Sequence, residues 1–286
     1  MIAFTLFDRP IYRYGILYGI TFLIGYYYLY WISNQSWLKK HTRLQDLFKN
    51  SLDLFFGIIV LGVIVGGRLG HVFLYDRGYY SQNLDQIISI WNGGMSFVGG
   101  FLGVMIGIFL LSWFRKLSWH EVFVLFDCIV FFLPLGILAG RIGNALNQEL
   151  YGKIVQLQSL TGIIGQTMVE NLFHGGVIKT YNNIDNQIRR NTNLFEGLYE
   201  GVIMIIFHIV VWGKKMITGI LQPGMITGWF CVLYSIGRFF LETMRDNPPS
   251  EYRYGILKSQ LLMVAMFGLG FGLILGRRKI KKNLTN

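Results

Sequence analysis

Charged residues are scarce in this sequence. Lysine, arginine, aspartate and glutamate make up only 14% of the 286 residues, while hydrophobic residues make up 53%. A typical soluble domain carries roughly 25% charged residues, so the charges here are too few to cover a water-soluble globule of this size. We therefore expect lipid to contact much of the surface, as in an integral membrane protein.

Cysteines and metal-ligand patterns are also sparse. Cys128 and Cys231 both lie inside apolar runs, whereas a disulfide framework or a zinc site needs more cysteines, or histidines at ligand spacing. The glycine-rich pieces follow apolar runs and do not open a βαβ unit, which argues against a nucleotide-binding fold. We therefore expect no bound metal and no cofactor.

Acidic residues are outnumbered by basic ones, 15 against 26, and the formal net charge is +11. In a soluble protein this charge suggests a nucleic-acid partner. Here the basic residues fall in short clusters between apolar runs, a pattern typical of loops beside anionic lipid headgroups. The sequence therefore predicts membrane lipid as a partner and no nucleic acid.

Seven apolar segments approach the length of about 20 residues that a helix needs to cross the hydrocarbon core. They are roughly 14–32, 52–75, 95–114, 120–140, 197–213, 222–242 and 256–276. We expect an all-α membrane protein with about seven transmembrane helices, in which residues 1–286 form a single integral membrane domain.

Four basic segments set the expected orientation. They follow spans one, three, five and seven: Lys39, Lys40, Arg43 and Lys49; Arg115 and Lys116; Lys214 and Lys215; and Arg277, Arg278, Lys279, Lys281 and Lys282. If the spans alternate, all four lie on one side, and the positive-inside rule makes that side cytoplasmic. The N-terminus is then outside and the C-terminus cytoplasmic. The polar stretch from about 141 to 196 is expected to form a small extracytoplasmic head.

Several ionisable or polar residues fall at membrane depth, where a charge costs about 2.5–3.5 kcal/mol on insertion scales. They are Arg68, His71, Asp127, Arg141, Asn144, Arg238, Glu242 and Arg245. Single arginines near span ends are explained by snorkelling to the interface, and Arg238 with Glu242 by a plain i,i+4 pair. Taken together, the set favours a polar cavity in the outer half of the membrane. Because guanidinium groups bind phosphate bidentately, the expected ligand is an anionic phospholipid.

Five blocks of the sequence resemble the prolipoprotein diacylglyceryl transferases. They occur in family order at 13–18, 66–75, 93–103, 140–152 and 234–242. The block that begins Gly-Arg-Ile-Gly-Asn at 140–144 is the most specific, and the others support it. They run from residue 13 to about 247, so the resemblance extends over most of the chain.

The resemblance implies a multi-pass enzyme of the bacterial cytoplasmic (inner) membrane. Such an enzyme transfers the diacylglyceryl group of phosphatidylglycerol to the lipobox cysteine thiol of a preprolipoprotein, which is the first step of lipoprotein maturation. The products are a thioether and glycerol 1-phosphate. Negative charge develops on the leaving phosphate, and fixed arginines are suited to stabilise it.

The resemblance also assigns roles to residues of this chain. Arg141 and Arg238 are the main catalytic candidates, and Glu242, Asn144, Tyr14 and Gly152 match positions that the family also uses. The pattern of residues adds His71 as a catalytic candidate. The expected substrate-binding residues are Arg141, Asn144, Tyr14 and Gly152, with Arg68, Gly99, Gly100 and Arg245 added from the same pattern. Gly99 and Gly100 resemble the broken start of a helix more than a packing contact. Phosphatidylglycerol is expected as a substrate and not as a cofactor.

Two departures from the family pattern affect the mechanism. Val98 stands where the family usually has a histidine, a candidate for assisting thiol deprotonation. Residues 190–196 read Arg-Asn-Thr-Asn-Leu-Phe-Glu where the family typically has His-Pro-Ser-Gln-Leu-Tyr-Glu. These losses leave open a divergent, non-catalytic phospholipid-binding relative. A small-molecule transporter would also suit intramembrane charges, but no inverted repeat is visible.

We hypothesise that His71 or Glu242 replaces the missing histidine, because His71 shares a helical face with Arg68. If His71 has this role, His71→Ala lowers the rate of thioether formation in an assay with a lipobox peptide and phosphatidylglycerol. Unchanged activity would leave His71 as a helix-end histidine bonded to backbone.

Overall fold

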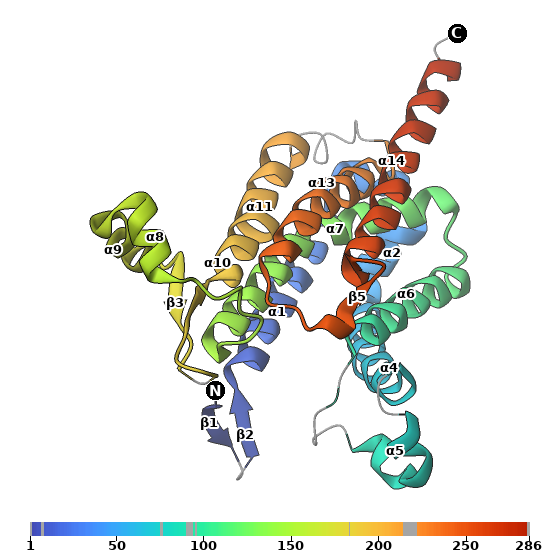
Figure 1. Cartoon of the computed structure of the whole chain (residues 1–286). Helices are drawn as coiled ribbons and strands as arrows, with labels where there is room; N and C mark the ends of the chain where they lie inside the picture. The colour runs from blue at the N-terminus through green and yellow to red at the C-terminus, as the bar shows by residue number, and fades with distance from the viewer. Residues whose placement is uncertain are drawn as a thin grey trace. The chain divides into compact units, whose positions relative to one another are not determined.

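The computed structural model describes the backbone of residues 2–6, 9–74, 77–89, 94, 96–182, 184–213 and 222–284 (Figure 1). Side chains are described for residues 15–73, 77–89, 94, 96, 99–182, 184–213, 222–249 and 251–276. The chain divides into two compact units, one of residues 1–25 with 126–286 and the other of residues 26–125. The boundaries between them fall inside two long helices.

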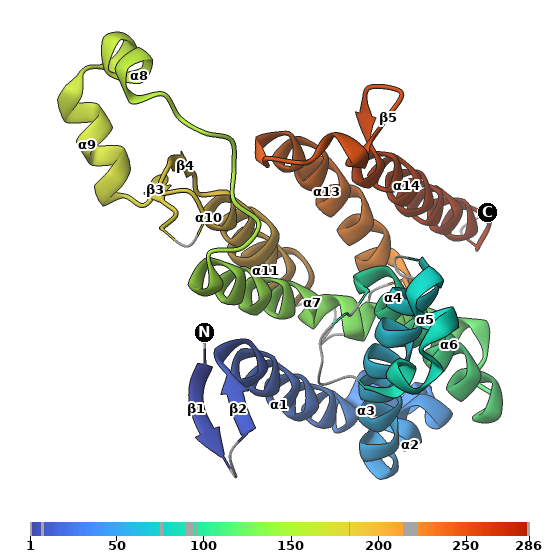
Figure 2. The same ribbon diagram turned by 60° about the horizontal axis from the view of Figure 1, so that its bottom comes forward.

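The unit of residues 1–25 and 126–286 consists mostly of helix. Its long helices are α1 (Arg13–Ser33), α7 (Trp119–Asn147), α13 (Met225–Leu241) and α14 (Lys258–Leu284), and the short helices α10 (Thr192–Glu196) and α11 (Met204–Phe207) precede α13. The π-helical stretch Gly197–Ile203 joins α10 to α11, and His208–Gly213 continues them as one rod. Figure 2 shows α13 and α14 side by side. Both α1 and α7 run on into the other unit.

The unit of residues 26–125 is built around two crossing rods. Its helices are α2 (Thr42–Asn50), α3 (Leu52–Leu61), α4 (Gly67–Leu74), α5 (Arg77–Gln82) and α6 (Phe97–Phe114). The π-helical turn Gly62–Gly66 makes α3 and α4 one rod, and α6 packs along it. Short 3-10 turns occupy Ser36–Lys40 and Leu84–Ile88.

Three small antiparallel hairpins depart from a strictly all-α fold. They are β1 (Ile2–Leu6) with β2 (Arg9–Tyr12), β3 (Ile178–Thr180) with β4 (Ile188–Arg190), and β5 (Tyr252–Arg253) with β6 (Ile256–Leu257). All three lie outside the long helices.

Each of the seven segments expected to span contains a helix, although Ser96, residues 222–224 and the β6 strand at the starts of three of them are not helical. Among the described residues, five helices are long and apolar enough to cross a membrane: Gly15–Ser33, Leu52–Phe73, Trp119–Asn147, Thr192–Gly213 and Lys258–Gly276. The apolar helix Gly99–Phe114 is shorter, and α13 has 17 residues. A helical, multi-pass membrane protein is therefore confirmed, whereas the count of seven spans and the orientation of the termini stay predictions.

Glycines bring α6 against the rod of α3 and α4. A Cβ on Gly99 would lie 2.3 Å from the Gly66 carbonyl oxygen, and one on Gly103 would lie 2.3 Å from that of Gly62. Backbone therefore touches backbone, a common way for helices to associate in lipid. Ser96 caps α6 by accepting the Gly99 N–H at 3.1 Å. Gly99 thus makes a packing contact, whereas the sequence favoured the broken start of a helix. Its role in substrate binding stays a prediction.

Asp127 does not join the arginines, contrary to the polar cavity expected from the sequence. Its carboxylate accepts the N–H groups of Gly224 and Thr227 at 2.7 and 2.8 Å and the Thr227 hydroxyl at 2.7 Å. These donors lie at the N-terminus of α13, where backbone N–H groups lack partners within the helix and a negative charge is favoured. Arg238 lies in the last turn of α13, so the two charges mark opposite ends of that helix.

The polar head is shorter than the stretch 141–196 suggests. Helix α7 continues past Arg141 to Asn147, and α10 begins at Thr192, before Glu196, so the paired charges at 141 and 196 lie within the helical rods. The head contains α8 (Leu157–Ile164), α9 (Gln166–His174) and the β3–β4 hairpin, and Figure 2 shows α8 and α9 projecting beyond α10. Its extracytoplasmic position stays a prediction.

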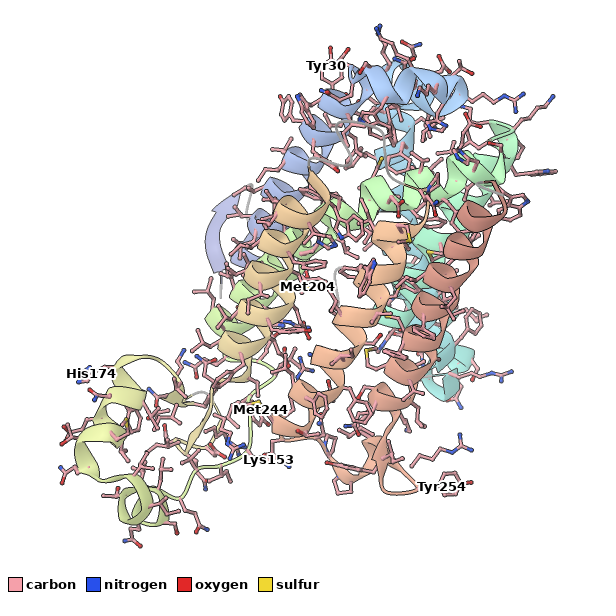
Figure 3. The ribbon with its side chains drawn as sticks, turned by 90° about the horizontal axis from the view of Figure 1, so that it is seen from above. Tyr30, Lys153, His174, Met204, Met244 and Tyr254 are labelled. Carbon is pink, nitrogen blue, oxygen red and sulfur yellow. The ribbon has the colours of Figure 1, made fainter. Side chains whose placement is uncertain are left out.

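A hydrogen bond and an ion pair connect the head to the residues that follow α13. The Lys153 N–H donates to the Met244 carbonyl at 3.1 Å, and Figure 3 shows these two residues side by side. Arg189 bonds the carboxylates of Asp185 and Asp246, each at 2.5 Å, and lies over the ring of Tyr151. The Arg189 guanidinium holds the pKa of Asp185 below its usual value.

Gly99→Ala tests the helix crossing. The added methyl group overlaps the Gly66 carbonyl, so α6 and α4 must separate, and we expect a loss of about 1–3 kcal/mol in the free energy of unfolding. Gly57→Ala is the matched control, because open space surrounds Gly57 in α3 and alanine favours a helix. Thermal unfolding in detergent should show a lower midpoint for Gly99→Ala alone. Equal midpoints would contradict the close backbone crossing.

Candidate functional site

Three arginines and three glutamates meet where α7, α10 and α13 come together. Arg141 lies in α7, Glu196 ends α10, and Glu200 lies in the π-helical stretch that follows. The remaining members come from the end of α13 and the turn after it: Arg238, Glu242 and Arg245. We call these six residues the arginine–glutamate cluster. All six lie in the unit of residues 1–25 and 126–286.

Glu196 is the centre of the cluster. Its carboxylate receives two parallel bonds from Arg245, from Nε and Nη2, each at 2.7 Å. Arg238 Nη1 lies at 2.8 Å from Oε1, and Arg141 Nη1 lies at 3.1 Å from Oε2. One carboxylate therefore holds three guanidinium groups, one from α7 and two from the end of α13 and the turn after it.

The other two carboxylates complete the array. Glu200 accepts from Nη2 and Nε of Arg141 at 2.9 and 3.2 Å and lies 3.3 Å from Nη1 of Arg238. Glu242 lies 2.5 Å from Nη2 of Arg238 and 3.9 Å from Arg245. Arg141 and Arg238 thus share two carboxylates, Glu196 and Glu200.

Helical spacing explains why these residues converge. Glu196 and Glu200 are four apart on one rod, and Arg238 and Glu242 are four apart at the end of α13, so each pair shares a helical face. Gly237 lets the two rods approach closely, because a Cβ there would lie 1.8 Å from the Tyr199 ring. The Tyr199 hydroxyl donates to the Leu233 carbonyl at 2.9 Å and fixes that contact.

The exposure of the side chains decides what a ligand meets. The side chains of Glu196 and Glu200 are 0% exposed, whereas 14% of Arg141 and 10% of Arg238 are exposed. A ligand therefore reaches guanidinium groups before it reaches these carboxylates. Buried ions without partners cost several kcal/mol each, so the carboxylates keep the arginines charged and oriented without a ligand.

Asn144 and Gly152, two predicted substrate-binding residues, lie close to the cluster in the chain or in space. Asn144 is buried in α7, one turn beyond Arg141. Gly152 forms a bridge with Arg245 and donates its N–H to the Arg190 carbonyl at 3.0 Å. A Cβ on Gly152 would lie 2.7 Å from that carbonyl oxygen, so only glycine fits here.

Arg68 and His71 lie in the unit of residues 26–125. Arg68 donates to the carbonyls of Gln86, Ile87 and Gly94 at 2.6, 2.8 and 3.2 Å. His71 packs edge-on against Tyr80 with ring centroids 6.0 Å apart. These contacts give Arg68 a structural task, holding the loop after α5, while the predicted roles of both residues in the reaction stay predictions.

Two residues of the sequence argument lie outside the described side chains. The backbone of Tyr14 is in the first turn of α1 and that of Val98 is in the first turn of α6. Gly100 is buried on α6, where an added Cβ would lie 3.5 Å from the Val63 carbonyl oxygen and 3.9 Å from the Gly67 Cα. The predicted substrate contacts of Tyr14 and Gly100 stay predictions.

Glu196 and Glu200 are the site residues that sequence reasoning missed. Their signal was present, because two carboxylates four apart in an apolar helix lie on one face and need cationic partners at membrane depth. Glu196 also closes the block 190–196, where it is one of the residues that match the family pattern. Among the described residues, no group of three or more His, Cys, Asp or Glu is arranged to hold a metal ion.

Comparisons with known proteins agree on one family. The family profile described as prolipoprotein diacylglyceryl transferase matches residues 1–276. A phosphatidylglycerol–prolipoprotein diacylglyceryl transferase of Nitrosomonas europaea is 35% identical over 90% of this chain and 84% of its own length. Relatives of the same name are 33% identical in Janthinobacterium sp. (90% and 89% covered) and 29% identical in a Wolbachia of Culex pipiens (99% and 96% covered).

Glu200→Gln tests whether the carboxylates stabilise the cluster. The substitution keeps the shape but leaves Arg141 and Arg238 short of a negative charge, and we expect a loss of about 3–5 kcal/mol in the free energy of unfolding. Glu170→Gln is the matched control, because Glu170 pairs with Gln166 on the exposed surface of α9. Unfolding in bicelles measures both, and equal losses would contradict a buried, mutually dependent cluster.

Proposed function

The chain belongs to the prolipoprotein diacylglyceryl transferase family, and we propose that the arginine–glutamate cluster binds the phosphate of its phospholipid substrate. The protein is a transferase that moves the diacylglyceryl group of phosphatidylglycerol to prolipoproteins. The acceptor in this proposal is the lipobox cysteine thiol. The observation that carries the proposal is that Arg141 and Arg238, from α7 and α13, contact the same two buried carboxylates.

The reaction requires stabilisation of a leaving phosphate. The thiol sulfur attacks the glycerol carbon, the carbon–sulfur bond forms, and the carbon–oxygen bond to phosphate breaks. Glycerol 1-phosphate leaves with the bonding electrons, so negative charge grows on its oxygens. Guanidinium groups already held in place stabilise this charge without reorganising, which lowers the barrier. Arg141 and Arg238 have that fixed geometry and partial exposure.

The thiol proton needs an acceptor. Glu242 belongs to the cluster and contacts Arg238 at 2.5 Å, which places a carboxylate beside the expected phosphate position. We therefore assign the base role to Glu242 first and retain His71 as the alternative. Asn144 and Gly152, beside Arg141 and Arg245, are proposed to contact the substrate at the cluster. Tyr14, Arg68, Gly99 and Gly100 are retained as substrate-binding residues on the sequence argument alone.

The membrane arrangement follows from the helices and the basic connections. We propose seven spans, with α6 and α13 as the two beyond the five that are long and apolar enough. The N-terminus is then outside and the C-terminus cytoplasmic, in the bacterial inner membrane. One integral membrane domain carries the head between α7 and α10 on the outer side. This orientation places the cluster, which adjoins the head, in the outer half.

Substitutions in the cluster test the proposal. Arg238→Ala should lower kcat/KM by roughly 10²–10³-fold in an assay with a lipobox peptide and phosphatidylglycerol, because one fixed donor to the leaving phosphate is lost. Arg238→Lys should restore only part, because lysine cannot bind bidentately. Arg253→Ala, which removes an exposed arginine from the β5 strand, is the control and should keep full activity.

Complementation tests the class of function in a cell. The wild-type gene should rescue a strain depleted of its own transferase, and Arg141→Ala should fail to rescue it. Binding of phosphatidylglycerol without thioether formation by the wild-type protein would instead identify a non-catalytic lipid-binding relative.

A further inference from the structure

A pocket of about 470 Å³ lies in the unit of residues 26–125, outside the arginine–glutamate cluster. Its lining comes from two connections between long helices: Lys40, His41, Thr42, Arg43, Ser118, His120 and Glu121. This volume falls within the range of small-molecule sites. None of its lining residues belongs to the arginine–glutamate cluster.

The Glu121 carboxylate connects the two segments that line the pocket. Its carboxylate accepts the backbone N–H and the hydroxyl of Ser118, each at 2.9 Å, and the Leu44 N–H at 3.4 Å. The first two bonds cap α7 and the third reaches the first turn of α2, so one carboxylate fastens two helix starts. Helix N-termini carry partial positive charge, which compensates the charge of Glu121.

Cationic and ring N–H groups line the rest of the pocket. Lys40 and Arg43 are exposed, and Arg43 donates one N–H to the Lys116 carbonyl out of the five a guanidinium carries. The rings of His41 and His120 stack with centroids 5.0 Å apart and planes at 28°. Burial lowers the pKa of His41, so its ring is neutral at neutral pH. The ring then adds hydrogen-bonding nitrogens to the pocket without placing a positive charge against His120. Such a set of donors suits a phosphate group.

Exposed aromatic residues lie beside pocket residues in the chain, at the end of α6 and the start of α7. Trp113, Phe114 and Trp119 are each 72% exposed, and Trp119 stands between two lining residues, Ser118 and His120. Tryptophans gather where a membrane meets water, at the depth of the headgroups. A soluble anion would gain nothing from these aromatic side chains, whereas the glycerol and acyl chains of a lipid would contact them.

We propose that this pocket binds the phosphate of an anionic phospholipid headgroup, with the lipid's glycerol and acyl chains against Trp113, Phe114 and Trp119. The pocket lies on the basic connections that follow spans one and three, so under the orientation proposed above the lipid belongs to the cytoplasmic leaflet. The site is then a second lipid site, separate from that of the substrate, and it does not depend on the identity of the catalytic residues.

Native mass spectrometry of the full chain tests the site with dioleoyl phosphatidic acid as the anionic lipid and dioleoyl phosphatidylcholine as the zwitterionic one. Lys40→Ala/Arg43→Ala should weaken binding of one phosphatidic acid molecule by roughly tenfold or more, because two cationic contacts are lost. Lys39→Ala/Lys49→Ala is the matched control, since both residues are exposed and lie outside the pocket lining. That control should bind as the wild type does.

Thr42→Trp tests the pocket with every charge kept. The tryptophan side chain should fill the pocket, so the variant should bind one phosphatidic acid molecule fewer than the wild type. All three variants should retain transferase activity, which shows that they fold and separates this test from that of the proposed function. Wild-type binding by both Thr42→Trp and Lys40→Ala/Arg43→Ala would overturn the site. Displacement of the lipid by inorganic phosphate at equal concentration would assign the pocket to a soluble anion and overturn the lipid proposal.

Discussion

The Glu196 carboxylate and its three guanidinium partners are the interaction on which the site depends. Arg141, Arg238 and Arg245 come from two helices and a turn, and each would be costly to bury alone. Glu196, fully buried, gives them a common counter-charge, and Glu200 and Glu242 complete the balance. The helices can therefore close around charges at this depth only as a set, which makes the cluster a condition of folding as well as a place for chemistry.

This balance also shapes how a phosphate can bind. The described cluster contains as many glutamates as arginines, so an arriving anion competes with carboxylates that already occupy much of each guanidinium. The partly exposed edges of Arg141 and Arg238 offer the remaining donors. The guanidinium groups are thus oriented before the substrate arrives. The binding energy can then stabilise the charge that develops on the leaving group.

Glycine and carboxylate contacts hold the helices that carry these charges. Gly237 admits the Tyr199 ring beside α13, and Gly99 admits the Gly66 backbone beside α6. Asp127 and Glu121 both bind helix N-termini, where a carboxylate replaces the missing partners of backbone N–H groups. Acidic residues are few in this chain, and those named here serve in ion pairs or helix caps, as expected where water is scarce.

The sequence by itself determined the membrane class, the helical segments and the arginines at 141 and 238, because apolar length and buried charge are properties of the chain read locally. Beyond the i,i+4 pair of Arg238 and Glu242, it could not identify the partners of these charges. Glu200 as counter-ion, Asp127 as a cap of α13, and Gly99 as a packing residue each depend on which helix lies alongside. Only the tertiary structure decided these contacts. The sequence shows that a buried charge needs a partner, but it does not show which distant residue neutralises that charge.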